Sequence, residues 1–459
     1  MMPFDAEAVA QAAVERAASD TPEEAARPPE FSDDALALRF SVRHRDRLRY
    51  VSAWGRWLIR EPGVWRFDET THAFDLARDI CRQAATECPN PRVAASIASA
   101  KTVAAVERLA KADRRHAATP DAWDKDPWAL NTPGGVVDLR TGQLRDHAPD
   151  DAFTKMTAVA PGGSCPTWRA FLNQIASGDV ELVRYLQRFI GYTLTGVIRE
   201  HAFAFLWGPG GNGKSVLLGT VARMLGDYAA TAMPDVFTVG RNDQHPTHLA
   251  ALRGARMVLV TETEEGRPWA EARIKSLTGG DRISARVMRG DPFEFDPAFK
   301  LWIAGNHRPV LRNPDPAMRR RLHLIPMTFV PPKPDRTLPE TLAGELPGLL
   351  AWAIQGNLDW QRIGLKPPQA VRDATADYFA DQDLLAEWIA DRCEPKSGAT
   401  MPAGRAFSDW KQWAIARGEE PGTEKRFSGA LERHFAKQRT NTGRVFLGVR
   451  MRPSDSGSW

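Results

Sequence analysis

The stretch GPGGNGKS, from Gly208 to Ser215, lies between an apolar run, AFAFLW, and an apolar helical pattern, VLLGTVARML. Its glycines fit two phosphate-binding patterns: G-x-G-x-x-G, typical of dinucleotide sites, and G-x-x-x-x-G-K-S, typical of nucleoside triphosphate sites. A dinucleotide site needs a carboxylate about 20 residues further on, at the end of a second strand. Asp235 lies in that region, but it follows a proline and the sequence predicts no apolar strand before it. We therefore predict a triphosphate site, in preference to a dinucleotide site or a purely structural turn.

Lys214 and Ser215 supply the chemistry that a triphosphate requires. They place a cation and a hydroxyl at the first turn of the predicted helix, whose free N–H groups favour anions. The cation suits the terminal phosphates of ATP and the hydroxyl suits Mg²⁺, so ATP and Mg²⁺ are the expected ligands. The residues expected to bind ATP are Gly208, Gly210, Gly211, Asn212, Gly213, Lys214, Ser215 and Val216. Ser215 is also expected to bind the metal.

The composition is that of a globular protein. The 459 residues are 43% apolar and 26% charged, which permits a sizeable core and, from chain length, about three domains. The formal charge of +4 permits a nucleic-acid partner without requiring one. No signal peptide and no run of about 18 apolar residues is visible, so we expect a soluble cytoplasmic protein with no membrane partner. The cysteines are too scattered for a C-x-x-C zinc or redox pair: Cys81, Cys88, Cys165 and Cys393.

Five segments are predicted along the chain. Residues 1–30 end in TPEEAARPPE, a proline-rich and charged stretch typical of a flexible arm. Residues 31–195 are expected to form a mainly helical domain. It contains a two-stranded piece, RWLIREPGVWRFDE, and a strand-and-turn stretch, WALNTPGGVVDLRTGQLRDH, which reverses at Gly134–Gly135 and Thr141–Gly142. Two groups of core residues are expected here: Trp54, Trp57 and Trp65, and the helical face Leu182, Tyr185, Leu186 and Phe189.

The remaining three segments begin with residues 196–335, where strands and helices alternate. Four apolar runs occur, AFAFLW, RMVLVTE, KLWIAGN and RLHLIPM, and the first three are apolar enough for buried parallel strands covered by helices. This organisation predicts an α/β P-loop ATPase core. Residues 336–380 are expected to form a helical lid or linker, and residues 381–459 a domain of three helices followed by a pair of strands. The last strand should alternate through Val445, Leu447, Val449 and Met451.

Polar residues follow two of these apolar runs. Glu262 and Glu264 come after RMVLV, at the expected carboxyl edge of the sheet, where one acid can hold the magnesium shell and another can orient or deprotonate the attacking water. A solvated acidic loop is the alternative. Asn306 ends KLWIAGN, where its amide can bond both the γ-phosphate and the water. An asparagine at a strand end is often only a turn residue.

Three adjacent arginines, Arg319, Arg320 and Arg321, precede the fourth apolar run. Arginines in this position suit an arginine finger, which reaches the nucleotide of a neighbouring subunit. A basic surface is the alternative, and only the motifs that precede the run favour the finger.

The ordered set GPGGNGKS, VLVTETEE, IKSLTGGDRISARVMRGDPFEF, KLWIAGN and MRRRLHLIP resembles superfamily 3 helicases. The resemblance is to the helicase portion of the phage and plasmid primase-helicase family, which is shared with the poxvirus primase-helicase. WDKDPWALNTPGGVVDLRTG followed by CPTWRAFLNQI resembles the domain before the motor, and the tail resembles the winged-helix-like C-terminal module. The resemblance implies an AAA+-like core and a ring, commonly hexameric, that binds ATP between subunits and draws one DNA strand through a central pore.

Roles for single residues also follow from the resemblance. Lys214 and Ser215 would bind phosphate and magnesium, and Asn306 would sense the γ-phosphate. Glu262 and Glu264 would form the acidic motif, with Glu262 at the metal; because Thr263 separates them, which acid activates water stays open. Arg320 or Arg321 would act in trans.

The same resemblance implies two places that contact DNA. The family has a hairpin that projects into the pore, here ISARVMRGDPFEF with turn chemistry at Arg289–Gly290–Asp291. Arg289, Arg286 and Lys275 are expected to follow the phosphate backbone, where contact is electrostatic. In the tail, EKRFSGALERHF carries Lys425, Arg426 and Arg433 on a short helix that suits a DNA groove, ahead of Lys437, Arg439 and Arg444. A solvated basic face is the alternative.

Two further patterns are set aside. Asp124 and Asp126 imitate the paired carboxylates of a metal-dependent primase, but the segment before them is too short and too helical for a polymerase-like core, so no primase domain is expected. His245 and His248 have no third metal ligand near them in the sequence.

The leading hypothesis is an ATP-dependent replicative DNA helicase of a prophage or plasmid, acting in the cytoplasm of a bacterial host. Its expected partners are single-stranded and forked DNA and further copies of itself, with a separate primase or other replication proteins as candidates. One rival is a replication initiator that uses ATP only as an assembly switch, which Glu264 and the arginine run disfavour. Another is a P-loop enzyme that phosphorylates a small molecule, which the basic hairpin disfavours.

Overall fold

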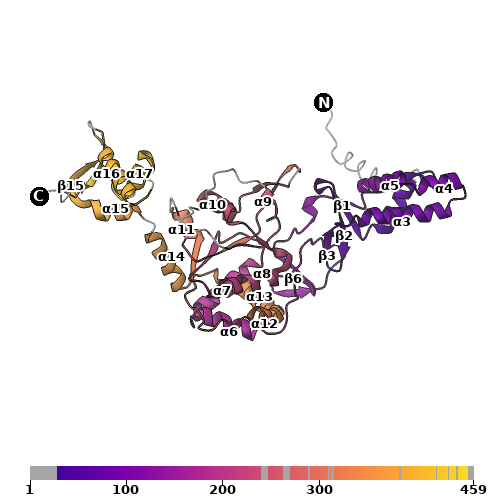
Figure 1. Cartoon of the computed structure of the whole chain (residues 1–459), viewed down its shortest axis with the longest axis horizontal. Helices are drawn as coiled ribbons and strands as arrows, with labels where there is room; N and C mark the ends of the chain where they lie inside the picture. The colour runs from indigo at the N-terminus through magenta and orange to yellow at the C-terminus, as the bar shows by residue number, and fades with distance from the viewer. Residues whose placement is uncertain are drawn as a thin grey trace, which may run out of the picture. The chain divides into compact units, whose positions relative to one another are not determined.

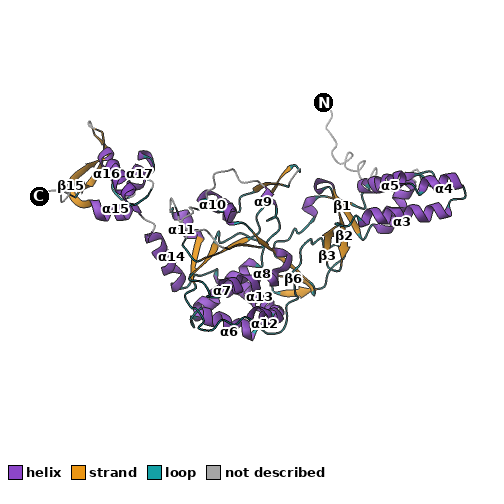
Figure 2. Cartoon of the chain, in the orientation of Figure 1, coloured by secondary structure: helices purple, strands orange, loops and turns teal. Residues whose placement is uncertain are grey.

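The structure is a computed structural model that describes residues 28–238, 247–261, 269–287, 290–308, 311, 315–381, 384–419, 421–432, 434–440 and 443–452. The chain divides into two compact units. The first unit comprises Met1–Gly163, Arg223–Tyr228 and Pro347–Ile354, and the second comprises Ser164–Ala222, Ala229–Leu346 and Gln355–Trp459. Helices and strands occur in both units (Figure 2), so the mixed α/β class that the sequence predicts is confirmed.

Four helices of the first unit are α2 (Asp33–His44), α3 (His72–Glu87), α4 (Pro91–Ile97) and α5 (Ala100–Ala112). Three of them begin at a polar capping residue: the side chains of Ser32, Asn90 and Ser99 accept hydrogen bonds from backbone N–H groups of the first turn. Helices α3, α4 and α5 lie side by side near the N-terminal end of the colour range (Figure 1). Their apolar faces pack with α2 into one core around Phe40, Ile80 and Val106, all fully buried.

A four-stranded sheet completes this core. Its strands are β1 (Leu48–Val51), β2 (Arg56–Glu61), β3 (Val64–Phe67) and β4 (Ala117–Ala118), in the order β3-β2-β1-β4. The two-stranded piece predicted from the sequence is the β2–β3 hairpin, but the sequence missed β1 and β4. Trp57 and Trp65 are buried as predicted. Trp54 is only half-buried, because it ends the short helix η1 (Ser52–Trp54) in the turn between β1 and β2.

A second sheet of the first unit contains β5 (Ala129–Thr132), β6 (Gly135–Asp138) and β7 (Gln143–Arg145) in antiparallel order. The reversals fall at Gly134–Gly135 and Thr141–Gly142, as the sequence predicts. Gly135 requires glycine because its φ is +128° and a Cβ atom there would lie 2.3 Å from the carbonyl oxygen of Arg145.

The second unit is built on a five-stranded parallel sheet. Its strands are β8 (Phe203–Trp207), β9 (Ala229–Thr231), β10 (Met257–Thr261), β13 (Lys300–Gly305) and β14 (Leu322–Pro326), in the order β14-β8-β13-β10-β9. All four apolar runs are therefore strands, as predicted. The sequence predicts no apolar strand before Asp235, and β9, which does precede it, is only three residues long, at the sheet edge and without a buried residue. The sequence therefore missed this strand.

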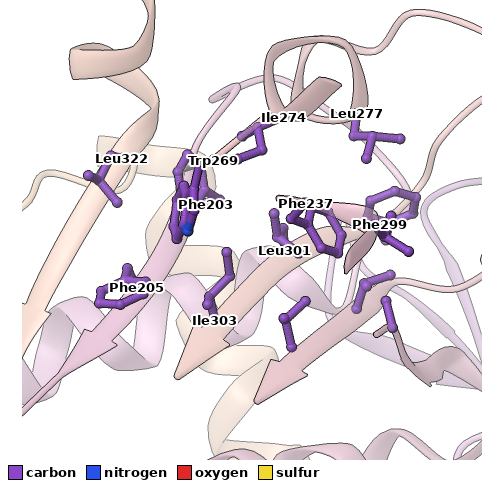
Figure 3. Packing of buried hydrophobic residues seen from close by; sticks show 14 of the residues in the cluster. Phe203, Phe205, Phe237, Trp269, Ile274, Leu277, Phe299, Leu301, Ile303 and Leu322 are labelled. Atoms are coloured by element: carbon purple, nitrogen blue, oxygen red, sulfur yellow. The ribbon is translucent and has the colours of Figure 1, made fainter. Parts of the chain in front are cut away.

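Helices cover both faces of this sheet. On one face, Phe203 and Phe205 of β8 pack under Trp269, whose ring centroid lies 5.8 and 5.6 Å from theirs (Figure 3). On the other face, Trp302 of β13 lies 4.7 Å, between ring centroids, from Phe189 of helix α7 (Val180–Thr193). The predicted apolar face of α7 is confirmed, because all four of its residues are buried: Leu182, Tyr185, Leu186 and Phe189. The short helix α6 (Pro166–Ile175) precedes α7.

A polar contact joins α7 to strand β14. The hydroxyl oxygen of Tyr185 lies 2.6 Å from Nδ1 of His323 on β14. Burial raises the pKa of Tyr185, so its hydroxyl stays protonated. Burial also lowers the pKa of His323 to about 4, so its imidazole is neutral at pH 7.

The burial of His323 makes folding sensitive to acid. An unfolded histidine has a pKa near 6.5, so as the pH falls from about 6.5 towards 4 the unfolded chain binds the proton before folded His323 does, and stability is lost. Between pH 7 and pH 5 the expected loss at this site is about 2 kcal/mol. Urea unfolding of the parent and of His323→Gln at both pH values checks this. An equal loss in the two proteins would show that His323 does not carry it.

Three helices follow the sheet in the chain: α12 (Leu338–Gly344), α13 (Leu346–Ile363) and α14 (Gln369–Asp381). They confirm the helices expected between residues 336 and 380. Helix α14 packs on the sheet, where the hydroxyl of Thr375 accepts a hydrogen bond of 3.1 Å from the amide of Leu324. None of the helices in the described ranges combines the length and apolar character needed to cross a lipid bilayer.

The C-terminal module has its own core, built around Trp388, Trp410 and Phe427. Its elements are α15 (Leu384–Arg392), β15 (Cys393–Pro402), α16 (Ala403–Ala416), α17 (Glu424–Leu431), β16 (Lys437–Thr440) and β17 (Gly443–Met451). The three helices and the final strand pair agree with the sequence, but β15, which joins the sheet beside β17, was missed. Its stretch CEPKSGATMP has too few apolar residues to predict a strand.

The predicted alternation along β17 was wrong at Leu447. That side chain is 36% exposed, whereas Phe446 is fully buried. The register between β15 and β17 shifts here, since Leu447 pairs with Thr400 and Val449 with Pro395, and Gly448 between them has φ +71°. This bulge changes which side chains face the core.

Candidate functional site

The glycine-rich loop, Gly208–Gly213, connects the end of β8 to the start of α8 (Lys214–Leu225). The loop begins against the end of the neighbouring strand β14, where the amide of Met327 donates a 2.7 Å hydrogen bond to the carbonyl of Trp207. Gly208 has φ +152°, and a Cβ atom there would lie 2.0 Å from the carbonyl oxygen of Met327. Gly213 has φ +85°, and a Cβ atom there would lie 3.0 Å from the ring of Phe171. Both positions therefore require glycine.

The loop offers a matched pair of substitutions. Gly208→Ala is expected to lower the free energy of unfolding by about 2 kcal/mol or more, because the methyl group meets backbone at an unfavourable φ. Gly210→Ala should change it by less than about 0.5 kcal/mol, since no atom lies within 4 Å of a Cβ atom at Gly210. Urea unfolding measures both. Equal effects would argue against the tight fit at Gly208.

Lys214 is held inside this loop. Its Nζ donates hydrogen bonds to the carbonyl oxygens of Gly208 and Pro209, at 2.7 and 2.9 Å, and to Oδ1 of Asn212, at 2.9 Å. The residue is only 7% exposed, and this burial lowers the pKa of Lys214. Asn212 also donates through Nδ2 to the carbonyl of Met327. The loop therefore fixes one ammonium group among oxygen atoms at the amino end of α8. Ser215, in the first turn of α8, is exposed, and Val216 is half-buried.

The neighbouring strands bring further predicted residues to the same edge of the sheet. Gly305, at the end of β13, pairs with Trp207, and Asn306 follows it as an exposed residue. Because parallel strands end at a common edge, Asn306 lies on the side of the sheet where the glycine-rich loop begins. Glu262 and Glu264 follow Thr261, the last residue of β10, but both lie outside the described residues.

Arg308 was missed by the sequence analysis. Its guanidinium carbon lies 4.4 Å from the ring centroid of Trp207, the residue that precedes the loop. The signal for it was weak, because an arginine three residues after a strand is common on protein surfaces. Its position near the loop makes it a further candidate for contact with an anion.

The three arginines lie on α11 (Pro316–Arg321) and have different surroundings. Arg319 packs over the ring of Phe379, with 5.1 Å between the guanidinium carbon and the ring centroid. Arg321 is half-buried and donates from Nη1 to the carbonyl of Ala317 at 3.1 Å. Arg320 is exposed, and it has no hydrogen bond or salt bridge within the described part of the chain. Arg319 is also exposed, but its guanidinium lies on Phe379, so Arg320 is the exposed arginine of the three without a contact in the described part of the chain.

Comparison with known proteins shows which families and which viral proteins this chain resembles. A family model described as "D5 N terminal like" matches residues 37–177, and a model of a family of unknown function, DUF5906, matches residues 206–321, which include the glycine-rich loop and α11. Two similar proteins carry provisional names as helicases. L207/L206 of Acanthamoeba polyphaga mimivirus is 26% identical over 295 residues, and 022R of Frog virus 3 (isolate Goorha) is 25% identical over 271 residues. This chain is a primase-helicase-like protein of phage and viral type.

The matches leave most of each viral protein uncovered. They span 58% and 54% of this primase-helicase-like chain but 31% and 28% of the two relatives, so the chain spans about a third of their length. C962R of African swine fever virus, provisionally named a primase, is 26% identical over 210 residues, which are 43% of this chain and 22% of that protein. The solved apo structure of the NrS-1 C-terminal region shares the fold: the TM-score is 0.51 at 10% identity, over 91% of this chain and all of that one.

The predicted hairpin of this primase-helicase-like chain is present. Strands β11 (Ile283–Arg286) and β12 (Pro292–Phe295) pair antiparallel. Arg286 is exposed and donates from Nε to the carbonyl of Gly290 at 2.7 Å. Arg289 lies outside the described residues.

Lys275, the third residue predicted near this hairpin, lies on α10 (Glu271–Gly279) and forms a salt bridge with Asp315. Burial alone would raise the pKa of Asp315, but hydrogen bonds from Lys275 and the Met318 amide outweigh it and lower the pKa. Asp315 is the residue that caps α11, so Lys275 fixes the start of the arginine-bearing helix. Its contact with DNA stays a prediction.

The basic residues of the C-terminal module that are predicted to contact DNA differ in their exposure and in their contacts. Lys425 is exposed on α17, while Arg433 and the side chain of Arg426 lie outside the described part of the chain. Lys437 on β16 lies 3.7 Å from a carboxylate oxygen of Glu432, and its Nζ lies 5.9 Å from the ring centroid of Phe446. The groove-binding helix stays a prediction.

Asp124 and Asp126, the carboxylates that imitate a primase pair, both bond to other residues of the chain. Asp124 accepts a 3.0 Å hydrogen bond from the amide of Thr154, and Asp126 forms a 2.9 Å salt bridge with Arg140. His245 lies outside the described residues, and His248 is on the short helix α9 (Thr247–Ala250). Within the described residues no group of three or more His, Cys, Asp or Glu side chains could hold a metal ion.

Proposed function

We propose that this chain is the ATP-hydrolysing motor subunit of a DNA helicase. The single observation that carries the proposal is the position of Lys214, whose ammonium is fixed by three oxygen acceptors in a glycine loop at the carboxyl end of a parallel strand. The amino end of a helix at such an edge favours anions, and an ammonium there adds the charge that terminal phosphates require. The strand order of the parallel sheet supports an AAA+-like P-loop core.

The residues present fit ATP and Mg²⁺. A Cβ atom at Gly208 or Gly213 would meet neighbouring protein atoms, so this conformation of the loop needs glycine at both positions, as the triphosphate pattern also requires. Lys214 would contact the terminal phosphates, Ser215 and Glu262 would hold the metal, and Asn306 would bond the γ-phosphate. Bound Mg²⁺ would neutralise charge on the phosphate oxygens. Glu262 or Glu264 would orient the attacking water.

A further positive charge that stabilises the transition state would come from a second copy of the chain. Arg320 is exposed on α11, whereas Arg319 and Arg321 make contacts within the chain. An arginine supplied by a neighbouring subunit couples hydrolysis to assembly. A hexameric ring is the assembly proposed, with the β11–β12 hairpin and Arg286 facing a DNA strand, and with the C-terminal module as a winged-helix-like DNA-binding domain. The proposed setting is replication of a phage or plasmid in a bacterial cytoplasm, with a separate primase or other replication proteins as partners.

The experiment that tests this function measures two activities of the full chain. ATP turnover is followed with and without single-stranded DNA, and unwinding is followed on a forked duplex. A helicase should hydrolyse ATP faster when DNA is present and should separate the fork only with ATP and Mg²⁺. ATP turnover that is the same with and without DNA, together with no unwinding, would exclude a helicase function. ATP-dependent assembly on DNA without turnover would favour the replication initiator.

A further inference from the structure

The four-stranded sheet of the first unit has two different faces. One face packs against the helices, and it carries Leu48, Tyr50, Trp57 and Ile59. Because side chains alternate along a strand, the residues between these point to the opposite face. That face has its own small apolar cluster of Val51, Leu58, Trp65 and Trp123. Around the cluster lie Arg49, Arg56, Arg60 and Phe67, which the register places on the same side.

Three guanidinium groups of this face lie over aromatic rings. Those of Arg49 and Arg60 lie over Trp65, with 5.2 and 5.8 Å from the guanidinium carbon to the ring centroid, and that of Arg56 lies over Phe67 at 5.5 Å. Arg49 also donates from Nη1 to the carbonyl oxygen of Leu48 at 2.9 Å. Arg56 and Arg60 form no side-chain hydrogen bond within the described residues, and a guanidinium that lies over a ring can still offer its N–H fork to phosphate oxygens.

Arg56 and Arg60 have no acidic partner. Neither forms a salt bridge within the part of the first unit that the structure describes. Arg66 on the same sheet differs, because its Nη1 lies 2.7 Å from a carboxylate oxygen of Asp227. On helix α3, Arg78 likewise pairs with Asp75 at 2.9 Å. The positive charges of Arg56 and Arg60 are therefore available to bind another molecule.

The rings at the edge of this face are accessible. Phe67 is 40% exposed, and half-buried Trp54 lies 5.5 Å from it between ring centroids. Bases of a single strand stack on such rings, whereas bases of a duplex are already stacked on each other. Arginines beside exposed rings match a chain that alternates phosphates and bases.

We propose that this face of the sheet, the Arg56–Phe67 face, binds single-stranded nucleic acid through Arg56, Arg60, Phe67 and Trp54. The arginines contact phosphates and the rings stack on bases. The site lies outside the nucleotide-binding and DNA-binding residues of the proposed motor, and its binding needs no ATP.

The first test is fluorescence anisotropy of labelled oligothymidylate with the full chain, without nucleotide, over a range of salt concentrations. Arg56→Gln combined with Arg60→Gln should reduce the slope of log affinity against log salt by about 0.7 for each phosphate that the variant no longer neutralises. The matched control is Arg78→Gln with Arg82→Gln, which removes the same charge from α3 and should leave the slope unchanged. Phe67→Leu, which keeps an apolar side chain, should weaken binding about fivefold or more.

A second measurement locates the bound strand. Photoreactive oligothymidylate should crosslink to the peptide that contains Trp54 and Phe67, in the parent and equally in Lys214→Ala, which removes the proposed ATP contact. Crosslinks confined to residues 200–330, or unchanged binding by the Arg56 and Phe67 variants, would overturn the proposal. If polyglutamate competes as well as unlabelled oligothymidylate, the face binds acidic chains by charge alone and the proposal is also wrong. Because neither assay uses ATP, both stay informative if the helicase proposal fails.

Discussion

Lys214→Ala is expected to lower ATP turnover by about 100-fold or more. A positioned charge on a reacting phosphate is worth about 3–4 kcal/mol in a site of this kind, and no other cation is bonded to the loop among the described residues. The variant also removes three hydrogen bonds that hold the loop, so its binding of ATP should weaken as well. Steady-state turnover and ATP titration measure the two effects.

Lys214→Met separates charge from packing. Methionine keeps an unbranched apolar stem in a site that is 7% exposed, so the fold should be retained while turnover falls as far as in the alanine variant. Thermal unfolding of both variants provides the control. Turnover within about threefold of the parent in a folded Lys214→Met protein would contradict a phosphate-binding role.

Arg320→Ala should reduce turnover by about 1,000-fold or more, because an arginine that acts in trans contributes that much. Mixing this variant with Lys214→Ala subunits should restore part of the activity. At some interfaces of the mixture, an intact Lys214 from one subunit meets an intact Arg320 from its neighbour. Neither variant alone can form such an interface, so recovery above the sum of the two is the expected result.

Arg319→Ala and Arg321→Ala are the matched controls for this experiment. Arg319 packs on Phe379 and Arg321 bonds Ala317, so their removal should affect α11 more than an adjacent subunit. If Arg321→Ala shows the recovery instead, Arg321 is the residue that acts in trans. If no arginine variant recovers on mixing, hydrolysis does not depend on a shared interface.

Much of the second unit follows from its sequence. The apolar runs that became β8, β10, β13 and β14 are long enough to exclude exposed strands, and their flanking helices require a parallel sheet. Strand β9 was missed because an edge strand of three residues depends on pairing with β10 and not on its own apolar content. The same reason applies to β15, in which two residues, Cys393 and Met401, are buried and the others are exposed or half-buried.

The candidate site was predictable where a motif fixes the backbone. Lys214 and Ser215 distinguish the triphosphate pattern from the dinucleotide pattern that the glycines also fit, and the structure places the loop at one sheet edge with Asn306. Long-range partners were not predictable. Nothing in the sequence near Lys275 indicates Asp315, and nothing near Trp207 indicates Arg308, because these contacts depend on how distant elements pack.

Asn212 gives the loop a property that its glycines do not. Its amide is a flat group with one donating and one accepting end: Nδ2 faces the carbonyl of Met327 and Oδ1 faces the ammonium of Lys214. Turning the amide over would set oxygen against oxygen and nitrogen against nitrogen, so only one orientation is allowed. The Asn212 amide therefore links the carbonyl that follows β14 to the charge at the amino end of α8 through two hydrogen bonds.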